Sequence, residues 1–192
     1  MKGPVRIALL DDHPAIRAGF EAIVALEPDL RVVGFAASEA ELRRILRRTC
    51  PDVVVLDLHH PGRGGLELCL QVKRRPRAPA VVLYTASADD ALGIAAALAG
   101  AGALVSKSSP AAVLVDAIRA TARAPHALPP VCWRMRREVA SRIDAADHAI
   151  LAMRLAGDPP DEIGDTLRLP SPTIRDRIGG IIAQIERLAS AA

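Results

Sequence analysis

Residues 53–62 read VVVLDLHHPG, and they decide how the first half of the chain is organised. The four consecutive apolar residues at 53–56 indicate a strand that is buried on both faces, as the strands of parallel sheets are. The run ends at Asp57 and then enters a Pro-Gly loop. A carboxylate at the end of a buried strand is costly unless it is paired or holds a metal. Ligands of open α/β sheets bind beyond the carboxyl ends of the strands, so Asp57 is the first candidate for chemistry.

The composition indicates a folded protein with room for two domains. The chain has 192 residues, of which 51% are hydrophobic and 24% charged, and this excludes the disordered class. Its three cysteines lack metal-ligand spacing and are typical of a reduced, cytoplasmic protein. No signal peptide is recognisable, and no apolar run approaches the roughly 20 residues that span a bilayer. We therefore expect a cytoplasmic protein without a membrane partner. The net charge of +3 is too small to argue for nucleic acid by itself.

Alternating strand and helix patterns predict five βα units in the first half of the chain. The expected strands cover residues 5–10, 30–36, 53–57, 80–84 and 103–106. A helical pattern follows each strand, and residues 38–41 form a capping pattern at the start of the second helix. Because the connections are short, these units predict a parallel, doubly wound sheet with helices on both faces.

Polar residues stand at the ends of these strands. Asp11 and Asp12 follow the first strand, Asp57 ends the third, Thr85 follows the fourth and Lys107 follows the fifth. Three crowded acids repel one another unless a cation joins them, and oxygen ligands of this kind suit Mg²⁺. A lysine and a hydroxyl could hold an anionic group opposite. The pattern therefore predicts a metal-assisted phosphoryl site in which a carboxylate is the acceptor.

Residues 5–123 resemble the receiver domain of bacterial two-component response regulators. The residues that carry this resemblance are Asp11-Asp12, Asp57 within LDLHHPG, Gly65, Thr85 followed by Ala86-Ser87, and Lys107 followed by Ser108. The resemblance implies a flavodoxin-like fold. It also implies that Asp57 accepts a phosphoryl group from a sensor histidine kinase.

The same resemblance assigns the other residues of the pocket. It implies that Asp12 and Asp57 ligate Mg²⁺ together with the backbone carbonyl of His59, while Asp11 acts through a bound water. It further implies that Thr85 and Lys107 hold the phosphoryl oxygens.

Two residues depart from the family's pattern. His60 stands where the family usually has Met, and Leu104 stands where many members have Tyr or Phe. Because that aromatic residue turns inward on activation in the family, we expect a smaller rearrangement around Thr85. The His59-His60 pair is expected to be an exposed loop rather than a second metal site.

The second half begins with a Pro-rich break. Residues 124–130 are the expected linker, and residues 131–143 are expected to form a connecting helix with a basic cluster. Asp144 is the expected N-cap of the next helix, which Gly157 closes. Asp158 is expected to cap the helix after it.

The last helix shows a clean apolar stripe. Ser171 is its expected N-cap, and the stripe consists of Ile174, Ile178, Ile181, Ile182, Ile185 and Leu188. A capped amphipathic helix that follows another helix after a tight turn predicts an all-α helix-turn-helix domain.

Residues 143–185 resemble the LuxR-type helix-turn-helix of the NarL/FixJ class of regulators. The matching positions are Gly157, Glu162-Ile163, Leu167, Leu169, Thr173-Ile174 and Ile181. The resemblance implies that Thr173, Arg175 and Arg177 contact phosphates and base edges in a major groove of double-stranded DNA.

Several features of this half weaken the resemblance. Asp147 replaces the family's usual Glu, and Arg168 replaces its usual turn Gly. Residues 133–192 contain nine Arg and nine acidic residues, so that neutral domain is expected to bind DNA weakly. The sequence given ends at Ala192, about where the family's fourth, dimer-forming helix begins, so the domain is expected to be truncated.

The expected organisation is a receiver at 1–123, a linker with its connecting helix at 124–142 and a helix-turn-helix domain at 143–192. The main hypothesis is a homodimeric, DNA-binding transcription regulator that phosphorylation of Asp57 controls, and not an enzyme. The alternative is an atypical regulator whose C-terminal helices bind a protein partner and contact DNA weakly. A flavodoxin-like hydrolase with an aspartyl-phosphate is a third possibility, which the helix-turn-helix spacing disfavours.

Overall fold

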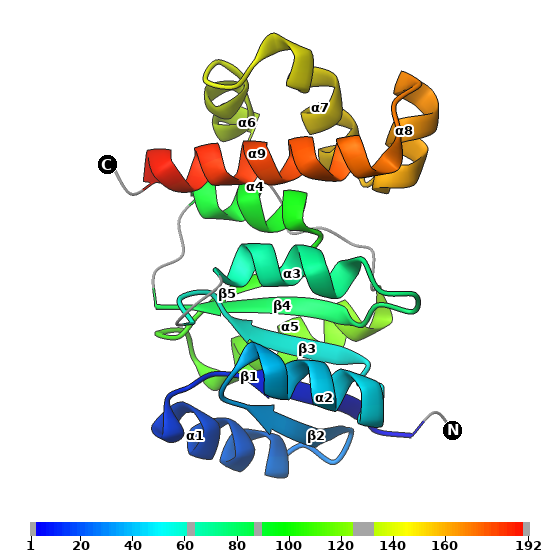
Figure 1. The fold of residues 1–192 in the computed structure, drawn as a ribbon. Helices are drawn as coiled ribbons and strands as arrows, with labels where there is room; N and C mark the ends of the chain where they lie inside the picture. Colours follow the sequence, from blue (N-terminus) through cyan, green and yellow to red (C-terminus); the bar gives the residue numbers. More distant parts are fainter. Residues whose placement is uncertain (1–2, 61–63, 87–89, 125–132, 190–192) are drawn as a thin grey trace.

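A parallel sheet forms the centre of the first half of the chain (Figure 1). The computed structural model describes residues 3–60, 64–86, 90–124 and 133–189. Within these residues five strands lie in the order β2-β1-β3-β4-β5, and every neighbouring pair is parallel. The strands are β1 Val5–Leu10, β2 Leu30–Ala36, β3 Val53–Asp57, β4 Ala80–Thr85 and β5 Ala103–Ser106. This confirms the predicted doubly wound, flavodoxin-like sheet.

Helices cover both faces of the sheet. They are α1 Pro14–Ala25, α2 Glu39–Thr49, α3 Gly65–Lys73, α4 Asp90–Ala99 and α5 Ala111–Arg123. Alternate residues of a strand point to opposite faces, so Ile7 and Leu9 of β1 pack in a cluster with α1 and α5. Ala8 and Leu10 pack in the other cluster, with α2, α3 and α4. The sheet is therefore buried on both sides.

The start of α2 shows why a predicted cap forms. The Ser38 hydroxyl accepts a hydrogen bond from the backbone N–H of Glu41 at 3.3 Å. The Glu41 carboxylate in turn accepts one from the backbone N–H of Ala37 at 2.8 Å. These bonds satisfy the N–H of Glu41 in the first turn and the N–H of Ala37 just before the N-cap, and they confirm the capping pattern.

The C-terminal region is helical, with boundaries that differ from the expected ones. It contains α6 Trp133–Ala140, a 3₁₀ turn at Ala145–Asp147, α7 His148–Ala156, α8 Pro160–Leu167 and α9 Ser171–Ala189. Asp144 caps the 3₁₀ turn rather than α7. The expected cap at Asp158 is wrong, because Pro159 occupies the N-cap and Pro160 begins α8. A residue before proline is disfavoured in the helical region, so Pro159 stays extended and the helix begins one residue later.

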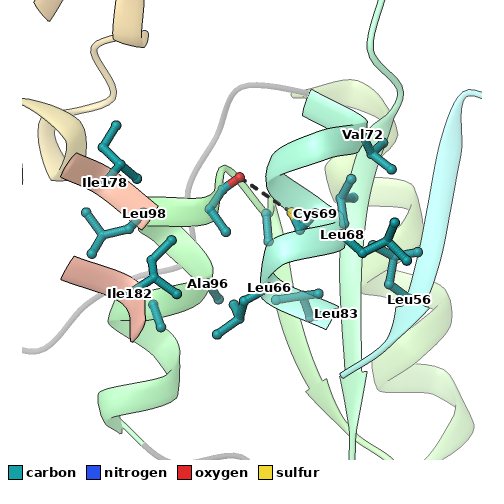
Figure 2. Packing of buried hydrophobic residues seen from close by; sticks show 14 of the residues in the cluster. Leu56, Leu66, Leu68, Cys69, Val72, Leu83, Ala96, Leu98, Ile178 and Ile182 are labelled. Carbon is teal, nitrogen blue, oxygen red and sulfur yellow. Dashed lines mark hydrogen bonds between the residues drawn. The ribbon is translucent and has the colours of Figure 1, made fainter. Parts of the chain in front are cut away.

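The C-terminal helices pack directly on α4, which lies between them and α3 (Figure 1). We call this packing of α4 against α6, α7 and α9 the interdomain joint. Residues 94–99 of α4 are at most 1% exposed. Leu98 of α4 lies beside Ile178 of α9, while Leu66 and Cys69 of α3 lie on the other side of α4 (Figure 2). A helix that is apolar all round is a buried helix, and α4 is buried by both halves of the chain.

The expected linker at 124–130 lies almost wholly outside the described residues, as do the side chains of Trp133, Arg134 and Met135. The domain boundaries at 123 and 142 therefore stay a prediction. None of the helices within the described residues is long and apolar enough to cross a membrane.

Candidate phosphorylation site

The ends of four adjacent strands, β1, β3, β4 and β5, bring the predicted pocket residues together. Asp11 and Asp12 directly follow β1, Asp57 ends β3 and Thr85 ends β4. Lys107 directly follows β5. Because β1, β3 and β4 are adjacent and parallel, their carboxyl ends meet at one edge of the sheet. Asp11 and Thr85 are 0% exposed and Asp57 is 2% exposed, so most of the polar groups in this pocket are out of water.

Lys107 joins the two buried carboxylates. Its Nζ lies 2.8 Å from Asp11 Oδ2 and 2.9 Å from Asp57 Oδ2. Burial alone lowers the pKa of the ammonium, but hydrogen bonds and charges from both acids outweigh it, so the pKa of Lys107 is raised. The lysine is therefore charged at neutral pH and neutralises part of the negative charge around Asp57.

Backbone contacts fix the loops that carry these groups. The backbone N–H of Lys107 donates to the Thr85 carbonyl at 2.6 Å, and that of Leu58 donates to the Tyr84 carbonyl at 3.0 Å. Gly65, the first residue of α3, approaches the end of β3 closely. A Cβ at position 65 would lie only 2.6 Å from the Leu58 Cα, so any side chain there would push α3 away from the pocket.

A histidine that sequence reasoning did not select also lies in the pocket. His13 Nδ1 is 3.0 Å from Asp11 Oδ1 and 3.1 Å from Asp12 Oδ1. The backbone N–H of His13 donates to the same Asp11 oxygen at 2.9 Å. The signal was present in the sequence, since His13 directly follows the two acids and precedes the proline that begins α1.

The donor set of the pocket fits a metal ion. One potential ligand atom from each of Asp11, Asp12, His13 and Asp57 lies within 4.8 Å of the others. Asp11 Oδ2 and Asp12 Oδ1 are buried; the Lys107 ammonium lies 2.8 Å from the former, and His13 Nδ1 lies 3.1 Å from the latter. One lysine does not offset the charge of three crowded carboxylates, and a hard cation would.

His59 lies across the mouth of the pocket. Its backbone N–H donates to Asp57 Oδ1 at 3.2 Å, which turns the loop after β3 back over the carboxylate. Its Nδ1 lies 3.4 Å from the Thr85 hydroxyl. His59 is exposed, as expected for this loop, and its imidazole also lies beside Thr85. His60 points elsewhere, with Nε2 3.0 Å from the carbonyl of Ala37.

The candidate DNA-contacting residues lie at the start of α9 and are differently exposed. Thr173 is exposed. Arg175 pairs with Asp161 of α8 at 2.5 Å, and Arg177 pairs with Asp147 at 3.2 Å. In this arrangement both guanidinium groups are held by acids of the same region.

Comparison with known proteins places the pocket in a family. Residues 7–119 match the family model described as "Response regulator receiver domain". The chain is 29% identical to the transcriptional regulatory protein LiaR of Bacillus subtilis, over 95% of this chain and 91% of LiaR. It is 28% identical to the DNA-binding transcriptional activator DevR/DosR of Mycobacterium tuberculosis, over 98% of this chain and 92% of that protein.

A solved structure agrees with this assignment. The two-component response regulator of the LuxR family from Aurantimonas sp. SI85-9A1 is 36% identical, with a TM-score of 0.61 over 72% of this chain and 97% of that one. The family match covers more than half of the chain and includes each pocket residue at a strand end. The chain therefore belongs to the response regulator receiver family and is a two-component response regulator of the NarL/LuxR class.

Proposed function

We propose that Asp57 accepts a phosphoryl group from a sensor histidine kinase and that this modification controls promoter binding by the C-terminal helices. The observation that carries the proposal is the position of Lys107, whose Nζ bridges Asp11 and Asp57 at the edge where the strands end. The Lys107 ammonium pairs with the Asp57 carboxylate and could equally pair with the phosphoryl oxygens once Asp57 is phosphorylated. Phosphoryl transfer depends mainly on such positioning and charge neutralisation.

In the proposed reaction one oxygen of Asp57 attacks the phosphorus of the donor's phosphohistidine. A new P–O bond forms while the P–N bond breaks, and its electron pair returns to the imidazole nitrogen. The Lys107 ammonium and the Thr85 hydroxyl then hold the phosphoryl oxygens. Thr85 is completely buried at the end of β4, so a bond from its hydroxyl to the new group would move the end of that strand.

The residues that would hold Mg²⁺ are Asp12, Asp57 and the backbone carbonyl of His59, with Asp11 acting through a water. The ion would screen the negative charges that meet as the acceptor and donor approach. The crowding of Asp11, Asp12 and Asp57 around a single lysine supports this proposal. His13 adds an imidazole beside both acids and would orient them toward the ion.

For DNA binding we assign Thr173, Arg175 and Arg177 to the contact surface at the start of α9. The two arginines would have to exchange their partners Asp161 and Asp147 for phosphates or base edges. A helix-turn-helix regulator of this kind reads two half-sites as a homodimer. We propose the same assembly here, with domain boundaries near 123 and 142, and a cytoplasmic location.

The first experiment is phosphorylation with Mg²⁺ and acetyl phosphate, read by intact mass and by solution size. We expect a single phosphoryl adduct together with a shift from monomer to dimer. The phosphorylated protein should then retard promoter DNA in a gel, with an affinity that falls as salt rises.

The control is Asp57→Asn, which removes the acceptor oxygen while it keeps the size of the side chain. An adduct that persists in this variant would place the phosphoryl group elsewhere. An adduct without a change in size or DNA affinity would contradict DNA-binding control and favour a regulator that acts through a protein partner.

A further inference from the structure

A cleft of about 1010 Å³ lies between the receiver and the C-terminal helices. One wall is the carboxyl end of α3 with the turn that follows it. The floor is the carboxyl end of α4, and the other wall is the turn between α7 and α8 with part of α9. Ligand sites of proteins have volumes of about 300–1,000 Å³ and are frequent at domain interfaces. The volume of this cleft is at the upper end of that range, and the cleft lies between the two halves of the chain.

The walls carry more basic than acidic side chains. The basic residues that line the cleft are Lys73, Arg74, Arg75, Arg77, Arg154 and Arg175, and the acidic ones are Asp158, Asp161 and Glu162. One pair of these, Arg175 with Asp161, is already engaged in an ion pair. The excess of basic side chains therefore lies on the α3 wall and at Arg154.

Arg154 is a buried cation without a carboxylate partner among the described residues. It is only 9% exposed. Its Nε donates to the Leu98 carbonyl at 3.1 Å and its Nη1 to the Asp158 carbonyl at 3.3 Å. The first of these contacts caps the carboxyl end of α4, whose dipole favours a cation. Carbonyl dipoles satisfy the hydrogen bonds of the guanidinium, but they do not neutralise its charge.

A second cation lies beside Arg154. A Cβ placed on Gly100 would lie 2.7 Å from Arg154 Nη2 and 3.4 Å from Lys73 Cγ, so both side chains converge over that glycine. Gly100 has a φ of +85°, a conformation that favours glycine. Burial lowers the pKa of Lys73, and the charge of Arg154 adds to this effect. Two cationic side chains therefore lie together at the floor of the cleft.

We propose that this cleft binds a small polyphosphorylated molecule such as a nucleoside polyphosphate. Arg75 and Arg77 would hold phosphate oxygens from the α3 wall, and Arg154 would meet them from the opposite wall. Apolar side chains that are not fully buried also line the cleft, including Leu70 and Pro76, and they offer a surface for a base. A concave site between two domains suits a small ligand better than a duplex. Such a ligand touches both halves of the chain and stabilises the interdomain joint.

The test uses the full chain with ATP and with inorganic tripolyphosphate, in EDTA and at constant ionic strength so that the Asp57 pocket holds no metal. Binding is measured by titration calorimetry, and the site is located by hydrogen exchange. We expect saturable binding, with protection at residues 74–78 and 156–160. The double variant Arg75→Gln, Arg77→Gln should weaken binding by about tenfold or more, because each lost arginine removes a charge-assisted hydrogen bond.

The matched control is Arg47→Gln, Arg48→Gln, which removes the same charge from the exposed end of α2, away from the cleft. It should leave the affinity unchanged. Equal weakening in both double variants would show attraction to net charge alone and would overturn the proposal. Binding of sulfate as tightly as ATP, or no saturable binding of either probe, would overturn it too.

Discussion

The phosphorylation pocket is held together by charged side chains, whereas the interdomain joint is held together by apolar ones. In the pocket, a few buried carboxylates and one lysine satisfy one another at the edge of the sheet. In the joint, α4 contributes an almost uninterrupted apolar surface to α3 on one side and to α9 on the other (Figure 2). The charge balance of the pocket would change with a single phosphorylation of Asp57, whereas apolar packing changes only when the packed surfaces separate. The pocket is thus suited to receive a signal, and the joint is suited to hold the two halves of the chain together.

The largest effect is expected from a charge in the joint. Ile178 of α9 is 1% exposed and lies beside Leu98 of α4 (Figure 2). Ile178→Asp would bury an unpaired carboxylate, and we expect the free energy of unfolding to fall by about 4 kcal/mol or more. The measurement is urea denaturation followed by circular dichroism.

Thr173→Asp is the matched control for that variant, because it adds the same charge to an exposed position of the same helix. Its free energy of unfolding should stay within about 0.5 kcal/mol of the parent chain. If Ile178→Asp were equally harmless, the joint would not be the close-packed surface described above.

The next effect concerns the pocket. Lys107→Met leaves the buried Asp11 and Asp57 carboxylates without their shared cation. Removing one partner of a buried pair typically costs about 3–5 kcal/mol. Because the Lys107 side chain is 16% exposed, we expect about 2–3 kcal/mol at pH 7 without Mg²⁺. Arg47→Met on the surface of α2 should cost almost nothing.

The pH and metal dependence of that loss identifies its cause. The pKa of Lys107 is raised in the folded chain, so its contribution is fully present below its ordinary pKa and is lost as pH rises through the higher, folded value. The difference between Lys107→Met and the parent chain should therefore shrink only in strong alkali. Added Mg²⁺ should restore part of the lost stability. A loss that neither alkali nor Mg²⁺ changed would be one of packing rather than of charge.

Cysteine labelling compares a buried position between α3 and α4 with an exposed position on the surface. Cys69 is 0% exposed beneath α4, where its thiol donates to the Ala99 carbonyl at 3.5 Å, and burial raises its pKa to about 12. Cys50 is exposed. Since the thiolate is the reactive form, N-ethylmaleimide at pH 8 should modify Cys69 about 100-fold more slowly than Cys50. Peptide mass spectrometry after timed quenching measures both rates, and comparable rates would mean that α4 separates readily from α3.

The pocket could be predicted from the sequence because its chemistry is local to strand ends. A buried apolar run followed by Asp57, and another followed by Thr85, already placed their side chains at one edge. Parallel topology then brought Asp11 and Lys107 to the same edge, and the structure has them within ion-pair distance of each other. His13 was missed, since a histidine before a proline is also an ordinary helix start.

The joint could not be predicted in the same way. The Ala-rich sequence of α4 indicates a helix and its burial, but it does not say what covers the second face. The partners of the proposed DNA-contacting arginines were equally hidden. Arg175 pairs with Asp161 and Arg177 with Asp147, and each pair joins residues from separate turns of the C-terminal region. Such contacts depend on how helices dock, which amphipathic periodicity alone leaves open.

The smallest expected change in free energy of unfolding concerns backbone strain in the C-terminal region. Arg168 follows α8 with a φ of +55°, the left-handed conformation that costs a side-chain-bearing residue about 1 kcal/mol or more. Arg168→Gly removes that strain but gives the unfolded chain more freedom, so we expect a net gain of about 0.5 kcal/mol in urea denaturation. Arg136→Gly, inside α6, has no strain to relieve and should lose about 1 kcal/mol. If Arg168→Gly raised the free energy of unfolding and Arg136→Gly lowered it, the backbone strain would lie in the turn before α9. A loss in both would mean that Arg168 contributes contacts worth more than its conformation costs.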